Sequence, residues 1–129
     1  MIASIRPASL DDILSIVEIE NKTNQMPWSK AQFLSSMEVG HYSLVMHKES
    51  DILGFAIYSP IIPESHLLNI AIDPVHQGKG LGDKLLKQII LQNKTIGVKT
   101  ISLEVRASNL TAINLYEKRG FHKDAIRPD

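Results

Sequence analysis

The chain contains no cysteine among its 129 residues, which excludes disulfide bonds, thiolate nucleophiles and zinc sites built from thiolates. It has no excess of charge either, because 14 lysine and arginine residues balance 14 aspartate and glutamate residues. A field that would draw the whole chain to nucleic acid or to a membrane surface is therefore not expected. No apolar run is long enough for a signal peptide or a membrane-spanning helix, which favours a cytoplasmic protein.

What is present is the composition of an ordinary soluble domain. Hydrophobic residues make up 43% of the chain and charged residues 22%, a balance typical of a globular core. The length fits one domain over residues 1–129, and no repeat, low-complexity stretch or linker divides it. The five histidines show no metal-ligand spacing such as i, i+4 on a helix, so no metal site is expected.

The first half of the chain predicts two helices and a β-hairpin. An amphipathic helix capped by Ser9 is expected, because apolar residues recur at i, i+3, i+4 and i+7: Leu10, Ile13, Leu14 and Val17. Ser29 and Gln32 form the pattern of a capping box for a second, short helix that ends at Met37. The segments YSLVMHK and ILGFAIYSP, rich in β-branched and aromatic residues, read as strands joined by a turn at ESD.

The second half predicts an apolar strand, a helix and an alternating strand. The segment HLLNIAID ends at Pro74, and a helix from Gly82 to Gly97 carries apolar residues on one face. Strand, helix and strand over this length predict a βαβ unit with parallel strands. A last helix is expected over residues 110–119. The second strand alternates between an apolar phase (Ile101, Leu103, Val105) and a polar phase (Ser102, Glu104, Arg106).

Three glycines, Gly78, Gly80 and Gly82, stand at alternate positions between the first of these strands and its helix. Open α/β sheets bind anions at this place, between the carboxyl end of a strand and the amino end of a helix, and glycine lets phosphate oxygens approach the backbone. A loop that only needs positive φ angles explains the glycines equally well. The spacing fits neither a P-loop nor a dinucleotide-binding motif, so a phosphate here would belong to another kind of ligand.

Two motifs resemble those of the GCN5-related N-acetyltransferases, the GNAT family. QGKGLG (residues 77–82) is similar to the family's Q/R-x-x-G-x-G/A loop for the diphosphate of acetyl-coenzyme A, and NLTAINLYEKRGF (residues 109–121) is similar to its N-x-x-A-x-x-L-Y-E-x-x-G-F segment. MPWS, LLNIAIDP and LEVRASN further resemble the RimI group, which acetylates the N-terminal alanine of a small-subunit ribosomal protein. The resemblance runs from Ile5 to Arg127 and implies the GNAT fold, of α/β (α+β) class, in which helices flank a mixed sheet with a βαβ acetyl-coenzyme A-binding core.

The resemblance also implies the cofactor site, with acetyl-coenzyme A as co-substrate. The pantetheine arm would pair like an added strand with the backbone that follows Asn69, and the diphosphate would lie on the glycine loop. Asn109 matches a cofactor-contacting residue of the family and equally suits the N-cap of the last helix. The expected cofactor-binding residues are Ile70, Ala71, Ile72, Gln77, Gly78, Lys79, Gly80, Leu81, Gly82, Asp83 and Asn109.

For catalysis, Glu104 matches the general base of the RimI group and Tyr116 the family's general acid. An amine attacks a thioester only as the free base, so a base within reach is required. Glu104 could instead be a solvated strand carboxylate or a partner of Arg106, and Tyr116 could pack in the core. Since no cysteine is present and Ser108 has no recognisable histidine partner, direct transfer in a ternary complex is expected rather than an acyl-enzyme.

The acceptor implied by the resemblance is the N-terminus of a ribosomal protein, with no direct nucleic-acid or membrane partner. Pro27, Trp28 and Tyr42 are the expected substrate-binding residues, although a lone tryptophan is more often a core anchor. Two alternatives remain: an acetyltransferase for a small-molecule amine, and a non-catalytic module that senses acetyl-coenzyme A. Glu104 and Tyr116 argue against the sensor, because a pure binding module has no use for either.

The chain stops at IRPD, where RimI-group members continue to a final β-strand that pairs beside the strand of Glu104. We therefore expect that strand to have an open edge, which must be covered because unpaired ladder groups destabilise a sheet. The cover could come from self-association through the edge, from residues 121–127 folding back, or from further residues of a longer native chain.

Overall fold

The computed structural model describes residues 3–103, 105–106 and 126–127. Its larger sheet has five strands in the order β1-β2-β3-β4-β5. β4 and β5 are parallel, and the other neighbours are antiparallel. The strands are β1 (Ser4–Pro7), β2 (Tyr42–Lys48), β3 (Asp51–Ile61), β4 (Glu64–Ile72) and β5 (Thr100–Leu103).

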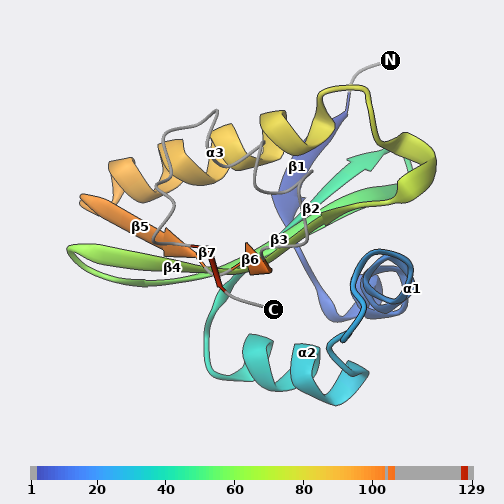
Figure 1. Ribbon diagram of the computed structural model, residues 1–129, viewed down its shortest axis with the longest axis horizontal. Coiled ribbons are helices and arrows are strands. Elements are labelled where there is room, and N and C mark those ends of the chain that lie inside the picture. Colours follow the sequence, from blue (N-terminus) through green and yellow to red (C-terminus); the bar gives the residue numbers. More distant parts are fainter. Residues whose placement is uncertain (1–2, 104, 107–125, 128–129) are drawn as a thin grey trace.

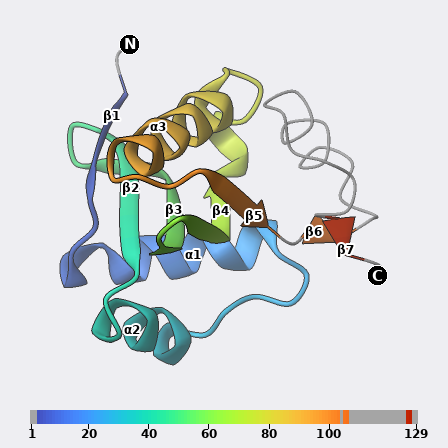
Figure 2. The ribbon, with the colours of Figure 1, turned by 90° about the vertical axis from the view of Figure 1, so that its left-hand side faces the viewer.

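Helices cover both faces of this sheet (Figures 1 and 2). On one face lies α3 (Leu81–Thr95), and on the other lie α1 (Ile13–Thr23) and α2 (Lys30–Glu38). Short 3-10 turns, η1 (Leu10–Asp12) and η2 (Pro74–His76), precede α1 and α3. Each face has its own buried apolar cluster, one built on Leu85, Leu86 and Ile89 of α3 and the other on Ile13, Ile16 and Phe33. The sheet is therefore the middle layer of three.

The expected apolar stripe of the first helix is partly wrong. Leu10 and Leu14 are 69% and 71% exposed, whereas Ile13, Ile16 and Ile19 are buried. Residues 10–12 form a 3-10 turn, which has fewer residues per turn than an α-helix, so the face that meets the sheet changes phase where α1 begins. Val17 is partly buried against the same cluster, as expected.

Ser9, the predicted cap of the first helix, stands at the N-cap of the 3-10 turn, whereas Asp12 occupies the N-cap position of α1. The predictions for the second helix, the hairpin and the βαβ unit are confirmed. In the capping box of α2, Ser29 N–H donates to Gln32 Oε1 (2.7 Å) and Gln32 N–H donates to Ser29 Oγ (3.2 Å). β2 and β3 form the hairpin, and β4, α3 and β5 form the βαβ unit with parallel strands. Gly97 follows α3 with φ +98°. The predicted helix over residues 110–119 lies outside the described residues.

A second, two-stranded sheet continues beyond β5. β6 (Val105–Arg106) pairs in parallel with β7 (Ile126–Arg127), and Figure 2 shows both beside the end of β5. For these residues the pairing agrees with the expectation that residues 121–127 fold back beside the strand of Glu104. Among the described residues, no helix has the length and apolar character to cross a membrane.

An ion pair fixes the start of α1. Arg6 on β1 donates to both carboxylate oxygens of Asp12, at 2.8 and 2.9 Å, and Ser9 N–H donates to Asp12 Oδ2 at 2.8 Å. The Arg6 guanidinium lowers the pKa of the buried Asp12 carboxyl group below its ordinary value. Asp12→Asn should therefore destabilise the fold at neutral pH by about 1.5–3 kcal/mol, the usual range for hydrogen bonds to a charged group.

This loss should depend on pH in a defined direction. Since the folded-state pKa of Asp12 is depressed, its stabilisation is complete above about pH 4, the range of an unfolded aspartate, and is lost as the pH falls through the folded value. Urea unfolding of both proteins over this range should show the difference shrinking in acid. A difference that stayed constant would contradict the role of the Asp12 charge.

Close contact between β3 and β4 requires a glycine at position 54. A Cβ there would lie 2.5 Å from Ile72 Cδ1 and 2.7 Å from the Ala71 carbonyl oxygen. Gly54→Ala should thus cost about 1–3 kcal/mol through overpacking. Adding Ile72→Val removes Cδ1 and should restore part of that loss in thermal unfolding. Strictly additive losses would show that this contact is not the cause.

Candidate functional site

The two parallel strands, β4 and β5, separate part of the way along their length. Their paired positions run from Glu64 opposite Thr100 to Leu67 opposite Leu103. β4 then continues to Ile72, while β5 ends at Leu103. No described strand pairs with residues 68–72 on the β5 side. On this side the Ile72 carbonyl oxygen accepts a hydrogen bond from Gln77 Nε2, and no strand of the described residues takes up the other backbone groups.

A β-bulge lies at the point of separation. Ile57 is opposite Asn69 and Tyr58 is opposite Leu67, so Leu68 is an extra residue in β4. Because of it, Leu67 and Ile70 both pack toward α3, although three positions apart would normally place them on opposite faces. Bulges are over-represented next to active sites, where they re-aim side chains. Here the bulge directs Asn69 toward α1.

The glycine loop follows β4 and leads into α3. Gly78 and Gly80 have φ angles of +82° and +77°, and a Cβ on either would meet nothing within 4 Å. The two explanations of the glycines are thus compatible: the turn needs positive φ, and the space over the backbone is open. Gln77 closes the loop, because its Nε2 donates to the Ile72 carbonyl oxygen at 3.0 Å.

The loop ends at a helix amino terminus suited to an anion. Lys84 N–H donates to the Gly80 carbonyl oxygen at 3.1 Å and starts the hydrogen bonding of α3. The amides of residues 80–82 precede that bond and point along the positive end of the helix dipole. Lys79 is exposed beside them and adds a positive charge, while Asp83 is half-buried in the first turn.

A buried carboxylate lies between α1 and β4, on the face of the sheet opposite α3. Glu20 of α1 is 0% exposed, and its Oε2 accepts hydrogen bonds from Asn69 Nδ2 (2.9 Å), Trp28 N–H (3.0 Å) and Asn24 Nδ2 (3.2 Å). Its Oε1 is buried and has no hydrogen-bond partner in the described part of the chain. Sequence reasoning missed Glu20, although a carboxylate four positions after Ile16 falls on the apolar stripe of α1 and could have been noticed.

The expected acceptor residues lie on two different faces of the sheet. Trp28 is half-buried in the loop between α1 and α2, with its ring centroid 5.1 Å from that of Phe33, and Pro27 beside it is exposed. Trp28 therefore packs at the edge of the core while its backbone amide binds Glu20. Tyr42 instead contacts Tyr58 at a centroid distance of 5.1 Å, in the layer of α3. The structure does not bring Tyr42 together with Trp28.

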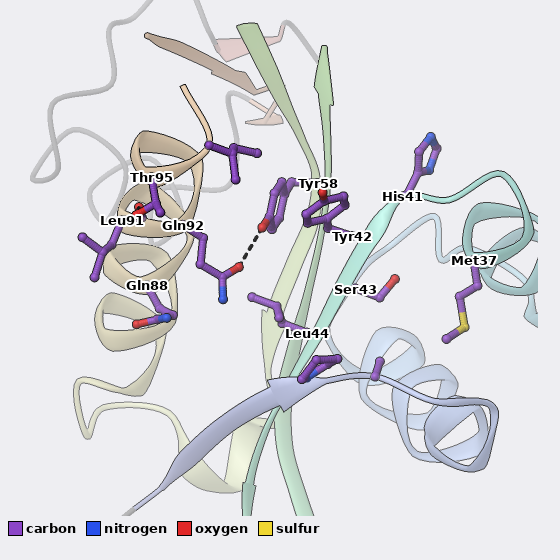
Figure 3. Close-up of a pocket in the computed structure, with 13 residues that line it drawn as sticks. Met37, His41, Tyr42, Ser43, Leu44, Tyr58, Gln88, Leu91, Gln92 and Thr95 are labelled. Carbon is purple, nitrogen blue, oxygen red and sulfur yellow. Dashed lines mark hydrogen bonds between the residues drawn. The ribbon is translucent and has the colours of Figure 1, made fainter. Parts of the chain in front are cut away.

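Tyr42 lines a cavity of about 650 Å³ between β2 and the second half of α3. Figure 3 shows Tyr42 and Tyr58 side by side and the 2.7 Å hydrogen bond from the Tyr58 hydroxyl to Gln92 Oε1. Burial raises the pKa of Tyr58 to about 12, so this hydroxyl stays a neutral donor. The residues of α3 that line the cavity, from Gln88 to Ile96, are remote from the glycine loop at the other end of that helix.

Three predicted site residues, Glu104, Asn109 and Tyr116, lie outside the described residues. In the sequence, Glu104 follows directly after Leu103, which is the last residue of β5 to pair with β4. Ile70, Ala71 and Ile72 lie in the stretch of β4 that pairs with β3 but not with β5, and residues 77–83 form the loop and the first turn of α3. Within residues 3–103, 105–106 and 126–127, no group of three or more histidine, aspartate or glutamate side chains could hold a metal ion.

Comparison with known proteins matches this arrangement. The family model described as Acetyltransferase (GNAT) family matches residues 9–121. The ribosomal protein bS18-alanine N-acetyltransferase of Salmonella typhimurium is 39% identical over 92% of this chain and 80% of that protein. The crystal structure of the Escherichia coli ribosomal-protein-S18-alanine N-acetyltransferase superposes with a TM-score of 0.87 at 36% identity, over 94% of this chain and 78% of that one. PaiA N-acetyltransferase from Thermoplasma acidophilum, solved with coenzyme A, shares the fold with a TM-score of 0.85 at 21% identity.

Proposed function

The chain belongs to the GNAT family of acetyltransferases, and we propose that it acetylates the N-terminal alanine of a ribosomal protein with acetyl-coenzyme A. The separation of β4 from β5 beside the glycine loop carries this proposal, because one opening offers both a strand edge and an anion site. The similar enzymes of Salmonella typhimurium and Escherichia coli are named for alanine of bS18. That name supplies the acceptor, which the fold alone does not specify.

The cofactor fits the opening in two parts. The amide-bearing arm of coenzyme A would hydrogen-bond as an added strand to the free edge at Ile70, Ala71 and Ile72. Its diphosphate would lie over the open backbone of Gly78 and Gly80, at the positive end of α3 and near Lys79. Gln77 supports the loop indirectly, because its hydrogen bond to the Ile72 carbonyl oxygen holds the loop to the end of β4. Asn109, at the start of the helix predicted over residues 110–119, is proposed to contact the cofactor as well.

The chemistry is a direct transfer between two bound molecules. The acceptor α-amine nitrogen attacks the thioester carbonyl carbon, a C–N bond forms and the C–S bond breaks. Glu104 takes the proton of the amine, directly or through one water, and Tyr116 donates a proton to the departing thiolate sulfur. The position of Glu104 directly after Leu103 suits this role, because β5 leaves β4 there.

The acceptor would approach from the layer of α1 and α2. The loop between these helices exposes Pro27 and holds Trp28 against the core, and it faces β4 through Glu20. Residues 24–29 are called the acceptor loop below. Tyr42 is not part of this proposal, because it lies in the α3 layer beside the cavity.

Acetyl-coenzyme A should increase the free energy of unfolding by mass action, by about 2.7 kcal/mol at a concentration of 100 Kd, and so raise the melting temperature, while NADH and ATP should not. Gly80→Ala should weaken this effect, since a Cβ would stand where the diphosphate approaches. Gly40→Ala is the matched control: Gly40 has φ +87° and equally open surroundings, but lies between α2 and β2. Equal losses of cofactor binding in both variants would reject the loop as the diphosphate site.

Glu104→Gln should keep acetyl-coenzyme A binding and lower turnover by roughly 10²- to 10⁴-fold, the usual contribution of a general base. Tyr116→Phe should also retain binding and slow transfer. The assay should compare peptides with different first residues, polyamines and amino sugars under one condition. Preference for an N-terminal alanine peptide supports the proposed acceptor, and preference for a polyamine or amino sugar contradicts it. Normal turnover of Glu104→Gln at every pH would remove that residue from the mechanism.

A further inference from the structure

We propose that Glu20 is a positioning residue for acetyl transfer, whose buried carboxylate fixes the acceptor loop to the bulged part of β4. The inference rests on the proposed function, since it assigns the loop to the acceptor. It starts from one oxygen atom: Glu20 Oε2 accepts hydrogen bonds from Asn24 and Trp28, both in the acceptor loop, and from Asn69 of β4. The helix that carries Glu20, the loop that follows it and a distant strand therefore meet at one point.

The burial of this carboxylate needs an explanation other than packing. Glu20 is fully buried, and no described lysine, arginine or histidine forms an ion pair with it. Removing a carboxylate from water is costly even when it is hydrogen-bonded, and apolar residues often replace buried ionic groups without loss of stability. An apolar side chain of similar size would fill the same space, but it could not accept hydrogen bonds from two amide side chains and a backbone amide.

The three donors lie where acceptor and cofactor must meet. Asn69 comes between the bulge at Leu68 and Ile70, the first residue of the proposed place of the pantetheine arm. Trp28 N–H belongs to the acceptor loop, directly after the exposed Pro27. The carboxylate thus sets the distance between the side that presents the amine and the strand that presents the thioester. A misplacement of about 1 Å in such a pair can reduce the rate by roughly 10²-fold.

The chain provides a built-in probe of this arrangement. Trp28 is the single tryptophan of the sequence, it lies in the acceptor loop, and its ring packs against Phe33. Its fluorescence therefore reports the position of the loop without any assay of activity. In Glu20→Ala the loop loses its anchor, so the emission should shift to the red and quenching by acrylamide should increase. Glu20→Gln keeps an acceptor oxygen for the three donors and should show a smaller change.

Kinetics should separate positioning from stability. With Glu20→Ala we expect kcat/KM for the N-terminal alanine peptide to fall roughly 10- to 100-fold, with acetyl-coenzyme A affinity largely retained and with partial rescue in Glu20→Gln. Asn69→Ala should give a loss of the same kind. Asp12→Asn is the matched control, because Asp12 is also a buried carboxylate of the α1 layer but bonds Arg6 and Ser9 instead of the loop. It should lower the melting temperature without changing the fluorescence or the peptide kinetics.

The measurements test the positioning role of Glu20 and the proposed function separately. The choice that the unsubstituted protein makes among peptides, polyamines and amino sugars tests the proposed acceptor. The ratio of variant to unchanged protein with the preferred amine, together with Trp28 fluorescence, tests Glu20. An unmoved loop in Glu20→Ala, or equal kinetic losses in Glu20→Ala and Asp12→Asn, would overturn the positioning role. If Glu20→Ala fails to fold, the same readouts on Glu20→Gln and Asn69→Ala decide, and unchanged values in both overturn it.

Discussion

The structure depends on one limit of strand pairing: β4 and β5 are hydrogen-bonded for only four positions. A parallel pair requires a crossover, and α3 supplies it by passing over the sheet from the end of β4 to the start of β5. Because β4 continues past the end of β5, its last residues before α3 have no described strand beside them on that edge. The strand edge and the amino terminus of α3 therefore face the same opening. A fully paired β4 would have a stable sheet and no place for a ligand between the strands.

The two layers of helices have different parts in this arrangement. In the α3 layer, the helix dipole and the glycine backbone lie at one end and the Tyr58–Gln92 hydrogen bond, between two neutral groups, lies at the other. The layer of α1 and α2 contains the two buried carboxylates of the described residues, Asp12 and Glu20. One fixes where α1 begins against β1, and the other joins α1 to β4. The two buried carboxylates thus fix the position of α1 against the sheet, on the side where the acceptor is proposed to bind.

The sequence predicted those features of the fold whose interacting residues lie within a few positions of one another. The Ser29–Gln32 capping box and the glycines at positive φ are local features, and the βαβ unit follows from a change of period. The prediction was wrong about Leu10 and Leu14, because the inward turn of Asp12 depends on its ion pair with Arg6 of β1. Glu20 could be seen to fall on the apolar stripe of α1, but its contact with Asn69 could not be predicted, since Asn69 lies far away in the chain. The bulge at Leu68 could not be predicted, because the run LLNIAI has a single polar residue, Asn69, and shows no alternation of polar and apolar residues that an inserted residue would interrupt.

The bulge at Leu68 divides β4 into two short segments that follow one another. Before Leu68 the strand has neighbours on both edges, and after it, among the described strands, only β3. One inserted residue changes which phase of the sequence faces which helix layer, so Leu67 before the bulge and Ile70 and Ile72 after it belong to the same cluster under α3. Substitutions in the two halves are therefore coupled through shared packing. A change of side-chain volume at Leu67, in the paired half, should be felt in the half that borders the opening.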